Sequence, residues 1–111
     1  MKTLLKGGRV VSGSGVIAAD VLLEGETIAA VGPNLAADGA ETVDCTDKLL
    51  FPGFIDAHTH FDLEVAGTIT ADDFTTGSRA ALRGGTTTVI DFAAPDKGEP
   101  LHTGLQRWHR K

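Results

Sequence analysis

The sequence predicts a mixed α/β fold, in which a small β layer precedes the first two units of a parallel β/α architecture. In the first half, short runs rich in Val, Ile and Leu are bounded by Gly or Pro, a pattern typical of short strands. From Pro52 onwards, strand-like and helix-like segments alternate twice. Strand, helix, strand and helix is the order of parallel βα units. The change at Pro52 predicts two domains, residues 1–51 and 52–111.

The β layer is expected to be built from antiparallel strands. Gly7-Gly8, the stretch 12–15, the stretch 24–26 and Gly32-Pro33 separate the apolar runs. Residues 33–40 have the composition of a loop. The expected strands are residues 3–6, 9–11, 16–23, 27–31 and 41–45.

The second half starts with an apolar run at 54–60, which predicts a buried strand followed by an extended loop over 61–69. Thr70, with Asp73 three residues later, matches a helix capping box, and negative charge is favoured in a first helical turn. The expected apolar face of this helix consists of Phe74, Ala81 and Leu82.

Gly84-Gly85 ends this helix, and the β-branched run 86–92 predicts a second buried strand. Pro100 suits the first turn of a final helix, whose apolar stripe would be Leu101, Leu105 and Trp108. A (β/α)₈ barrel takes about 250 residues, roughly 30 per unit. The segment 52–111 is therefore long enough for about two of eight units.

Composition excludes several classes of function. Ten Lys and Arg against 15 Asp and Glu give a net charge of −5, without the basic face of a nucleic-acid-binding protein. No apolar stretch reaches the roughly 18 residues that a membrane-spanning helix needs. The single cysteine, Cys45, cannot form an internal disulfide and is expected to be a small buried side chain. We therefore expect a cytoplasmic protein without nucleic-acid or membrane partners.

The most informative feature is the segment Pro-Gly-Phe-Ile-Asp-Ala-His-Thr-His at residues 52–60. Side chains alternate along a strand, so Asp56, His58 and His60 face the same side. Two imidazoles at this spacing can bind one zinc ion, with Asp56 orienting a ring. The alternative is a pair of ordinary histidines on a partly exposed strand. Burying three ionisable groups without a partner would be costly, which favours a metal site at His58 and His60.

This segment resembles the first-strand signature of the metal-dependent amidohydrolase superfamily. Along essentially the whole chain, further motifs are similar to those of the dihydropyrimidinase and D-hydantoinase family. Dihydroorotases usually carry Arg two residues beyond the second histidine, and Asp62 at that position argues against that branch. The matching segments are residues 61–63, 67–68, 70–74, 84–87 and 90–92.

The resemblance implies an N-terminal β-sandwich followed by a TIM-type (β/α)₈ barrel, present here only in part. It also implies two zinc ions per active site, a bridging hydroxide that attacks a cyclic amide, and a homo-oligomer, typically a tetramer. His58 and His60 match the two first-strand metal ligands. The family's carboxylated lysine, its further histidines and its catalytic aspartate belong to later strands, so no catalytic residue is expected within 1–111.

Other polar residues are weaker candidates. Asp91, at the end of its strand, is expected to make a structural or outer-shell hydrogen bond. Asp62 is expected to stabilise its loop more than to serve the site, while His102 and His109 are expected on a solvated helix surface. Glu64-Val65 replaces the Pro and bulky residue often found there, which leaves the preferred ring substituent open.

Three functional hypotheses remain. The first is the N-terminal part of a zinc-dependent cyclic amidohydrolase acting on dihydropyrimidines or hydantoins. The second is a truncated, catalytically inactive fragment that binds metal weakly at most, because two histidines leave a tetrahedral ion half coordinated. The third is a small β-rich binding module with an incidental histidine pair. Exposed strand edges also predict self-association of this chain.

Overall fold

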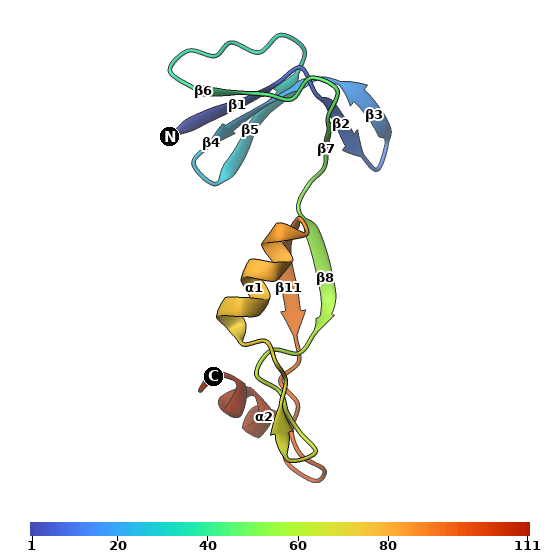
Figure 1. Ribbon diagram of the computed structural model, residues 1–111, viewed down its shortest axis with the longest axis vertical. Helices are drawn as coiled ribbons and strands as arrows, with labels where there is room; N and C mark the ends of the chain where they lie inside the picture. Colours follow the sequence, from blue (N-terminus) through green and yellow to red (C-terminus); the bar gives the residue numbers. More distant parts are fainter. The chain divides into compact units, whose positions relative to one another are not determined.

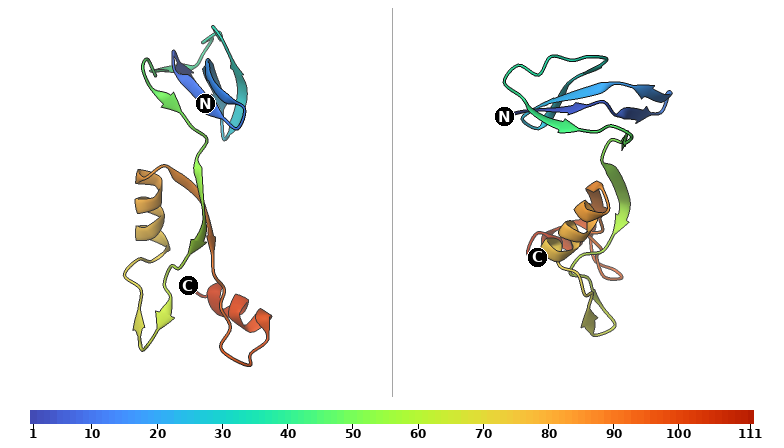
Figure 2. Two further views of the ribbon diagram at one scale, coloured as in Figure 1. Left: turned by 90° about the vertical axis from the view of Figure 1, so that its right-hand side faces the viewer. Right: turned by 45° about the horizontal axis from the view of Figure 1, so that its top comes forward.

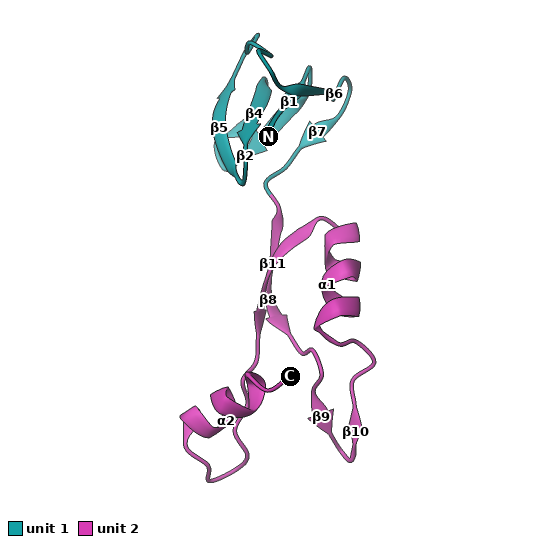
Figure 3. Ribbon diagram, turned by 90° about the vertical axis from the view of Figure 1, so that its left-hand side faces the viewer, with its two compact units in different colours: residues 1–52 teal, residues 53–111 magenta.

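The computed structural model describes all of residues 1–111, which form eleven strands and two helices. They divide into two compact units, Met1–Pro52 and Gly53–Lys111, coloured separately in Figure 3. The two larger sheets lie in the first unit, and two two-stranded sheets and both helices lie in the second (Figure 1). The chain thus has the mixed α/β composition that the sequence predicts. Neither helix is long and apolar enough to cross a membrane.

Unit 1 consists of two sheets and no helix. A four-stranded sheet has the order β5-β4-β1-β6, and a three-stranded sheet has the order β3-β2-β7. Both are mixed, because β6 pairs with β1 and β7 pairs with β2 in parallel, whereas only antiparallel pairs were expected. The strands are β1 (Lys2–Lys6), β2 (Arg9–Ser12), β3 (Gly15–Ala18), β4 (Asp20–Glu24), β5 (Thr27–Gly32), β6 (Glu41–Asp44) and β7 (Leu49–Leu50).

One long bent hairpin supplies strands to both sheets. The expected strand over 16–23 is in fact two strands, which meet at the buried Ala19. On the opposite arm the bend falls at Gly7-Gly8, and the N–H of Ala19 donates to the carbonyl of Gly8. A Cβ on Gly8 would lie 2.9 Å from Leu50 carbons, so a larger residue would not fit without movement. The prediction of a single strand was wrong because strand periodicity carries no information about such a bend.

The core of unit 1 surrounds this bend. Its buried apolar side chains are Leu4, Ala19, Val21 and Cys45, and Leu4 is completely enclosed. The Asp20 carboxylate is also buried and accepts hydrogen bonds from the backbone N–H groups of Gly7 (2.8 Å) and Leu35 (3.1 Å). The charged group therefore has partners, as a buried carboxylate requires.

Unit 2 is built around a parallel pair of strands joined by a helix. β8 (Phe54–Thr59) pairs with β11 (Thr86–Asp91), and α1 (Phe74–Arg83) lies alongside the pair (Figures 1 and 2). Gly84 caps the helix and Gly85, with φ +85°, leads into β11, as the double glycine predicts. The strands and helix follow the expected βαβ order. The prediction that both strands are buried was wrong for residues 1–111, since many of their apolar side chains are exposed, Ile55 by 66%.

Two local expectations for unit 2 were wrong. The segment expected to be an extended loop contains the hairpin β9 (Glu64–Val65) and β10 (Thr68–Ile69), whose turn residues both have positive φ. The N-cap of α1 is Asp73 and not Thr70, since the Asp73 carboxylate accepts from the N–H of Thr76. The Thr70 hydroxyl instead accepts from the N–H of Leu63 at the base of the hairpin.

The second helix, α2 (Leu101–Trp108), begins after Pro100 as expected. Its expected apolar stripe does not pack as a unit: Leu101 is 81% exposed and Leu105 is 48% exposed. The helix instead contacts the rest of unit 2 through Gly104, where a Cβ would lie 2.6 Å from the backbone nitrogen of Pro95. Close backbone packing at Gly104, together with the contacts of Trp108 with Asp91 and Phe74, therefore holds this helix against the rest of unit 2.

Candidate metal centre

The two histidines lie together where β8 ends. Their Nε2 atoms are 3.1 Å apart, and the ring centroids are 5.1 Å apart with planes at 73°. Both rings therefore extend from the same side of the strand, as alternation along a strand predicts. The Asp56 carboxylate does not reach either ring; it accepts a hydrogen bond from the backbone N–H of His58 at 3.1 Å.

The geometry of this pair suits one shared metal ion. Two nitrogens bound at about 2.0–2.1 Å in a tetrahedral arrangement would lie roughly 3.3 Å apart. The observed 3.1 Å between the Nε2 atoms of His58 and His60 is close to that value, and it is also a hydrogen-bonding distance between the two rings. No group of three or more His, Cys, Asp or Glu side chains that could hold a metal is present in residues 1–111. The pair can therefore supply two ligands, and further ligands have to come from outside these residues.

Phe92, immediately after β11, packs against both imidazoles. Its ring centroid lies 4.6 Å from that of His58 and 5.0 Å from that of His60, with planes tilted by 36° and 39°. An aromatic ring in contact with both histidines limits their rotation. The sequence analysis did not predict this role of Phe92. Its position directly after the second parallel strand could have indicated it, because the ends of neighbouring parallel strands lie side by side.

Asp91 connects three elements next to the histidines. Its Oδ1 accepts hydrogen bonds from the hydroxyl of Thr59 and from the N–H of Phe61, both at 3.1 Å. Its Oδ2 accepts from the indole Nε1 of Trp108 at 2.6 Å. The structural hydrogen bond expected for Asp91 is present, but Thr59 and Trp108 as its partners were not foreseen.

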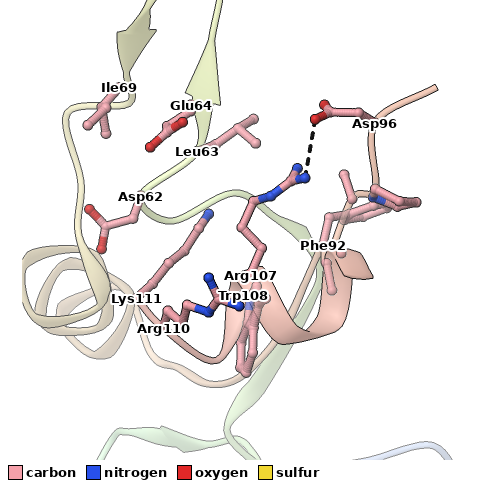
Figure 4. Close-up of a pocket in the computed structure, with 14 residues that line it drawn as sticks. Asp62, Leu63, Glu64, Ile69, Phe92, Asp96, Arg107, Trp108, Arg110 and Lys111 are labelled. Carbon is pink, nitrogen blue, oxygen red and sulfur yellow. Dashed lines mark ion pairs between the residues drawn. The ribbon is translucent and has the colours of Figure 1, made fainter. Parts of the chain in front are cut away.

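A cavity of about 660 Å³ lies beside this region, between the β9–β10 hairpin, the segment after β11, and α2 (Figure 4). It combines acidic and basic groups, and Arg107 forms an ion pair with Asp96 at 3.2 Å. The N–H of Asp96 and the guanidinium of Arg107 together hold the pKa of Glu99 below its ordinary value. The charged side chains lining the cavity are Asp62, Glu64, Asp96, Arg107, Arg110 and Lys111.

The remaining candidates lie apart from the histidine pair. His102 and His109 are exposed on or just after α2, as expected, and the His109 ring contacts Trp108. Asp62 has φ +48°, and its backbone N–H donates to the carbonyl of Asp72, which ties its loop to the start of α1. Cys45 is a buried free thiol in unit 1.

Comparison with known proteins identifies the family of this chain. Residues 49–103 match the model of the Amidohydrolase family. Over 111 residues the chain is 47% identical to a D-hydantoinase of Geobacillus stearothermophilus, covering 100% of this chain and 24% of that protein. It is 45% identical to dihydropyrimidinase 1 of Caenorhabditis elegans, covering 95% of this chain and 22% of that one.

Solved structures agree with the sequence comparison. The dihydropyrimidinase of Brevibacillus agri NCHU1002 superimposes with a TM-score of 0.92 at 46% identity, over 99% of this chain and 24% of that one. The chain belongs to the dihydropyrimidinase and D-hydantoinase family. The resemblance seen in the sequence motifs is thereby confirmed. The chain spans about a quarter of the length of these relatives.

Proposed function

We propose that residues 1–111 are the N-terminal part of a zinc-dependent cyclic amidohydrolase that opens the ring amide of hydantoins or dihydropyrimidines. The observation that carries the proposal is the His58–His60 pair, with its Nε2 atoms 3.1 Å apart at the end of β8. The names of the relatives, D-hydantoinase and dihydropyrimidinase, supply the substrate class.

The same proposal assigns the two segments to parts of a larger fold. Residues 1–51 would contribute to a β-sandwich, and residues 52–111 would form the first two βα units of a (β/α)₈ barrel. The parallel pairing of β8 with β11, joined through α1, supports this assignment. In such barrels the site lies at the carboxyl ends of the strands, where the histidines are found.

His58 and His60 would hold one zinc ion through their Nε2 atoms. Zinc bound in such a site supplies Lewis acidity towards a carbonyl oxygen and lowers the pKa of a coordinated water. This chain's residues contribute by placing the two imidazoles on one side of β8 and by limiting their rotation with the Phe92 ring.

The metal site can be tested with Co²⁺, which reports tetrahedral nitrogen coordination by its visible absorption. We expect weak binding by the 111-residue chain, since two histidines leave half the positions to water. His58→Ala and His60→Ala should each weaken binding at least about tenfold. His102→Ala is the matched control, because it removes an exposed imidazole from α2. Equal binding by all variants would refute the proposed ligands.

A second candidate is a catalytically inactive fragment that binds metal weakly at most. The absence of a third metal-ligating side chain within residues 1–111 favours it. The purified chain is expected not to hydrolyse dihydrouracil or hydantoin. Zinc-dependent turnover of either compound by the 111-residue chain would exclude the hypothesis that it is a catalytically inactive fragment.

A further inference from the structure

The Asp91 carboxylate accepts hydrogen bonds from the residues on both sides of His60. Oδ1 accepts from the hydroxyl of Thr59, the residue before His60, and from the N–H of Phe61, the residue after it. Hydrogen bonds to an ionised carboxylate are about twice as strong as those between neutral groups. The position of His60 is thus fixed by one side chain of the neighbouring strand.

The strand register strengthens this arrangement. Asp91 pairs directly with Thr59 across the parallel β8–β11 ladder, and the N–H of Phe92 donates to the carbonyl of Thr59 at 3.3 Å. β8 pairs with no other strand in residues 1–111. Within residues 1–111, the described contacts at the end of β8 therefore come from Asp91 and its immediate neighbour.

Asp91 also connects this strand end to α2. Oδ2 accepts from the indole Nε1 of Trp108 at 2.6 Å, and the Trp108 ring meets Phe74 of α1 edge to face at a centroid distance of 5.4 Å. The two oxygens thus bind different partners: Oδ1 accepts hydrogen bonds from the end of β8, and Oδ2 accepts one from α2. Variants can remove these links separately.

We propose that Asp91 is a positioning residue that holds His60 where it can share one metal ion with His58, acting through Thr59 and Phe61. The inference deepens the proposed function and rests on it for the role of the histidines. Asp91 touches neither imidazole directly; the hydrogen bonds reach the backbone and hydroxyl groups beside His60.

The test compares Thr59→Val, Asp91→Ala and Trp108→Phe in the 111-residue chain. Thr59→Val removes one bond to β8 without changing charge, and Trp108→Phe removes only the link to α2. Two properties are measured: the affinity for Co²⁺, and, without metal, the nuclear Overhauser effect between the ring protons of His58 and His60. The second readout reports ring placement whether or not metal binds.

Asp91→Ala should weaken Co²⁺ binding by about 10- to 100-fold, the range typical of outer-shell partners. Thr59→Val should weaken it several-fold, and adding it to Asp91→Ala should cause little further loss, because the two residues share one interaction. Both variants should reduce the ring-to-ring signal. Trp108→Phe should change either property less than threefold.

Unchanged affinity and ring contact in Asp91→Ala and Thr59→Val would overturn the inference. An effect of Trp108→Phe equal to that of Asp91→Ala would also overturn it, by showing that docking of α2 is responsible. If the Asp91→Ala variant does not fold, the Co²⁺ affinity and the ring-to-ring signal of the charge-neutral Thr59→Val variant test the inference. If the parent chain does not bind Co²⁺ through the histidines, the proposed metal site fails, while the ring-to-ring signal still tests the positioning role.

Discussion

Unit 1 and unit 2 are of similar length but are stabilised in different ways. Four of the five buried apolar side chains lie in unit 1, around the bend of its long hairpin. In unit 2 Phe61 is the only buried apolar side chain, and a series of edge-to-face ring contacts links it through Phe74 to Trp108. Unit 1, which has no candidate metal site, has the enclosed core. Unit 2, which contains the histidine pair, has exposed strand faces.

The difference follows from the kind of sheet in each unit. Parallel strands joined by helices normally have both faces covered. In unit 2 a single helix accompanies β8 and β11, and Phe54, Ile55 and Ile90 each remain more than half exposed. Specific hydrogen bonds and ring contacts therefore carry more of the local order at the histidines.

Leu4→Ala should strongly destabilise unit 1. The side chain is fully buried, and truncating such a leucine costs about 2–5 kcal/mol. Amide exchange measured by NMR should show loss of protection in β1 and β4, while the amides of α1 keep theirs. Ile28→Ala, at a position 61% exposed, is the control and should change stability by no more than about 0.5 kcal/mol. Simultaneous loss of protection in α1 would show that the units are not independent.

Gly104→Ala should detach α2 in unit 2. The added Cβ would lie 2.6 Å from the Pro95 nitrogen and 2.9 Å from the Ala93 oxygen, which are backbone atoms. Overpacking of about 1–3 kcal/mol exceeds the roughly 1 kcal/mol that Ala gains over Gly in a helix. The Trp108 indole N–H resonance should lose its hydrogen-bonded shift. His102→Ala, on the exposed side of the same helix, should leave that resonance in place.

Asp20→Asn tests the buried carboxylate of unit 1. An amide keeps one acceptor oxygen and presents an NH₂ group to the second backbone N–H, leaving a buried donor unpaired. The expected cost is about 1–3 kcal/mol in the free energy of unfolding, measured by urea denaturation. Asp38→Asn, which changes an exposed carboxylate of the same unit, should have almost no effect. An equal loss in both variants would indicate a general charge effect.

Acid should weaken one local structure in each unit. The pKa of Asp73 is held below its ordinary value by hydrogen bonds from the N–H and hydroxyl of Thr76, and the pKa of Asp44 by the hydroxyl and N–H of Thr46. A carboxylate with a depressed folded-state pKa contributes stability above its unfolded pKa and loses it as pH falls through the folded one.

Below about pH 4, the chemical shifts of Thr76 and Thr46 should therefore move towards unfolded values, while Leu4 stays unchanged. Asp73→Asn should keep the helix cap and abolish the pH dependence at Thr76 alone. An unchanged pH dependence of the Thr76 chemical shift in Asp73→Asn would contradict the assignment of this effect to Asp73.

Most of the elements could be predicted from the sequence, because they depend on local patterns. Gly84-Gly85 ends α1 and the β-branched run after it forms β11, as expected. The shared side of His58 and His60 follows from strand periodicity alone. The choice between Thr70 and Asp73 as N-cap could not be made from spacing, since both precede the apolar run. It is decided by hydrogen bonds of the folded chain: Asp73 accepts from the N–H of Thr76, and Thr70 is engaged by Leu63.

Residue type and short-range spacing were enough to predict the βαβ order of the second unit, the histidine pair and the family motifs. The tertiary structure alone decided the bend that divides one hairpin between two sheets, the backbone packing at Gly104, and the Asp91 bonds to Thr59, Phe61 and Trp108. The Asp91 bonds join residues 17 to 32 positions apart. No local pattern encodes such distances, because they arise only when the strands and helices pack.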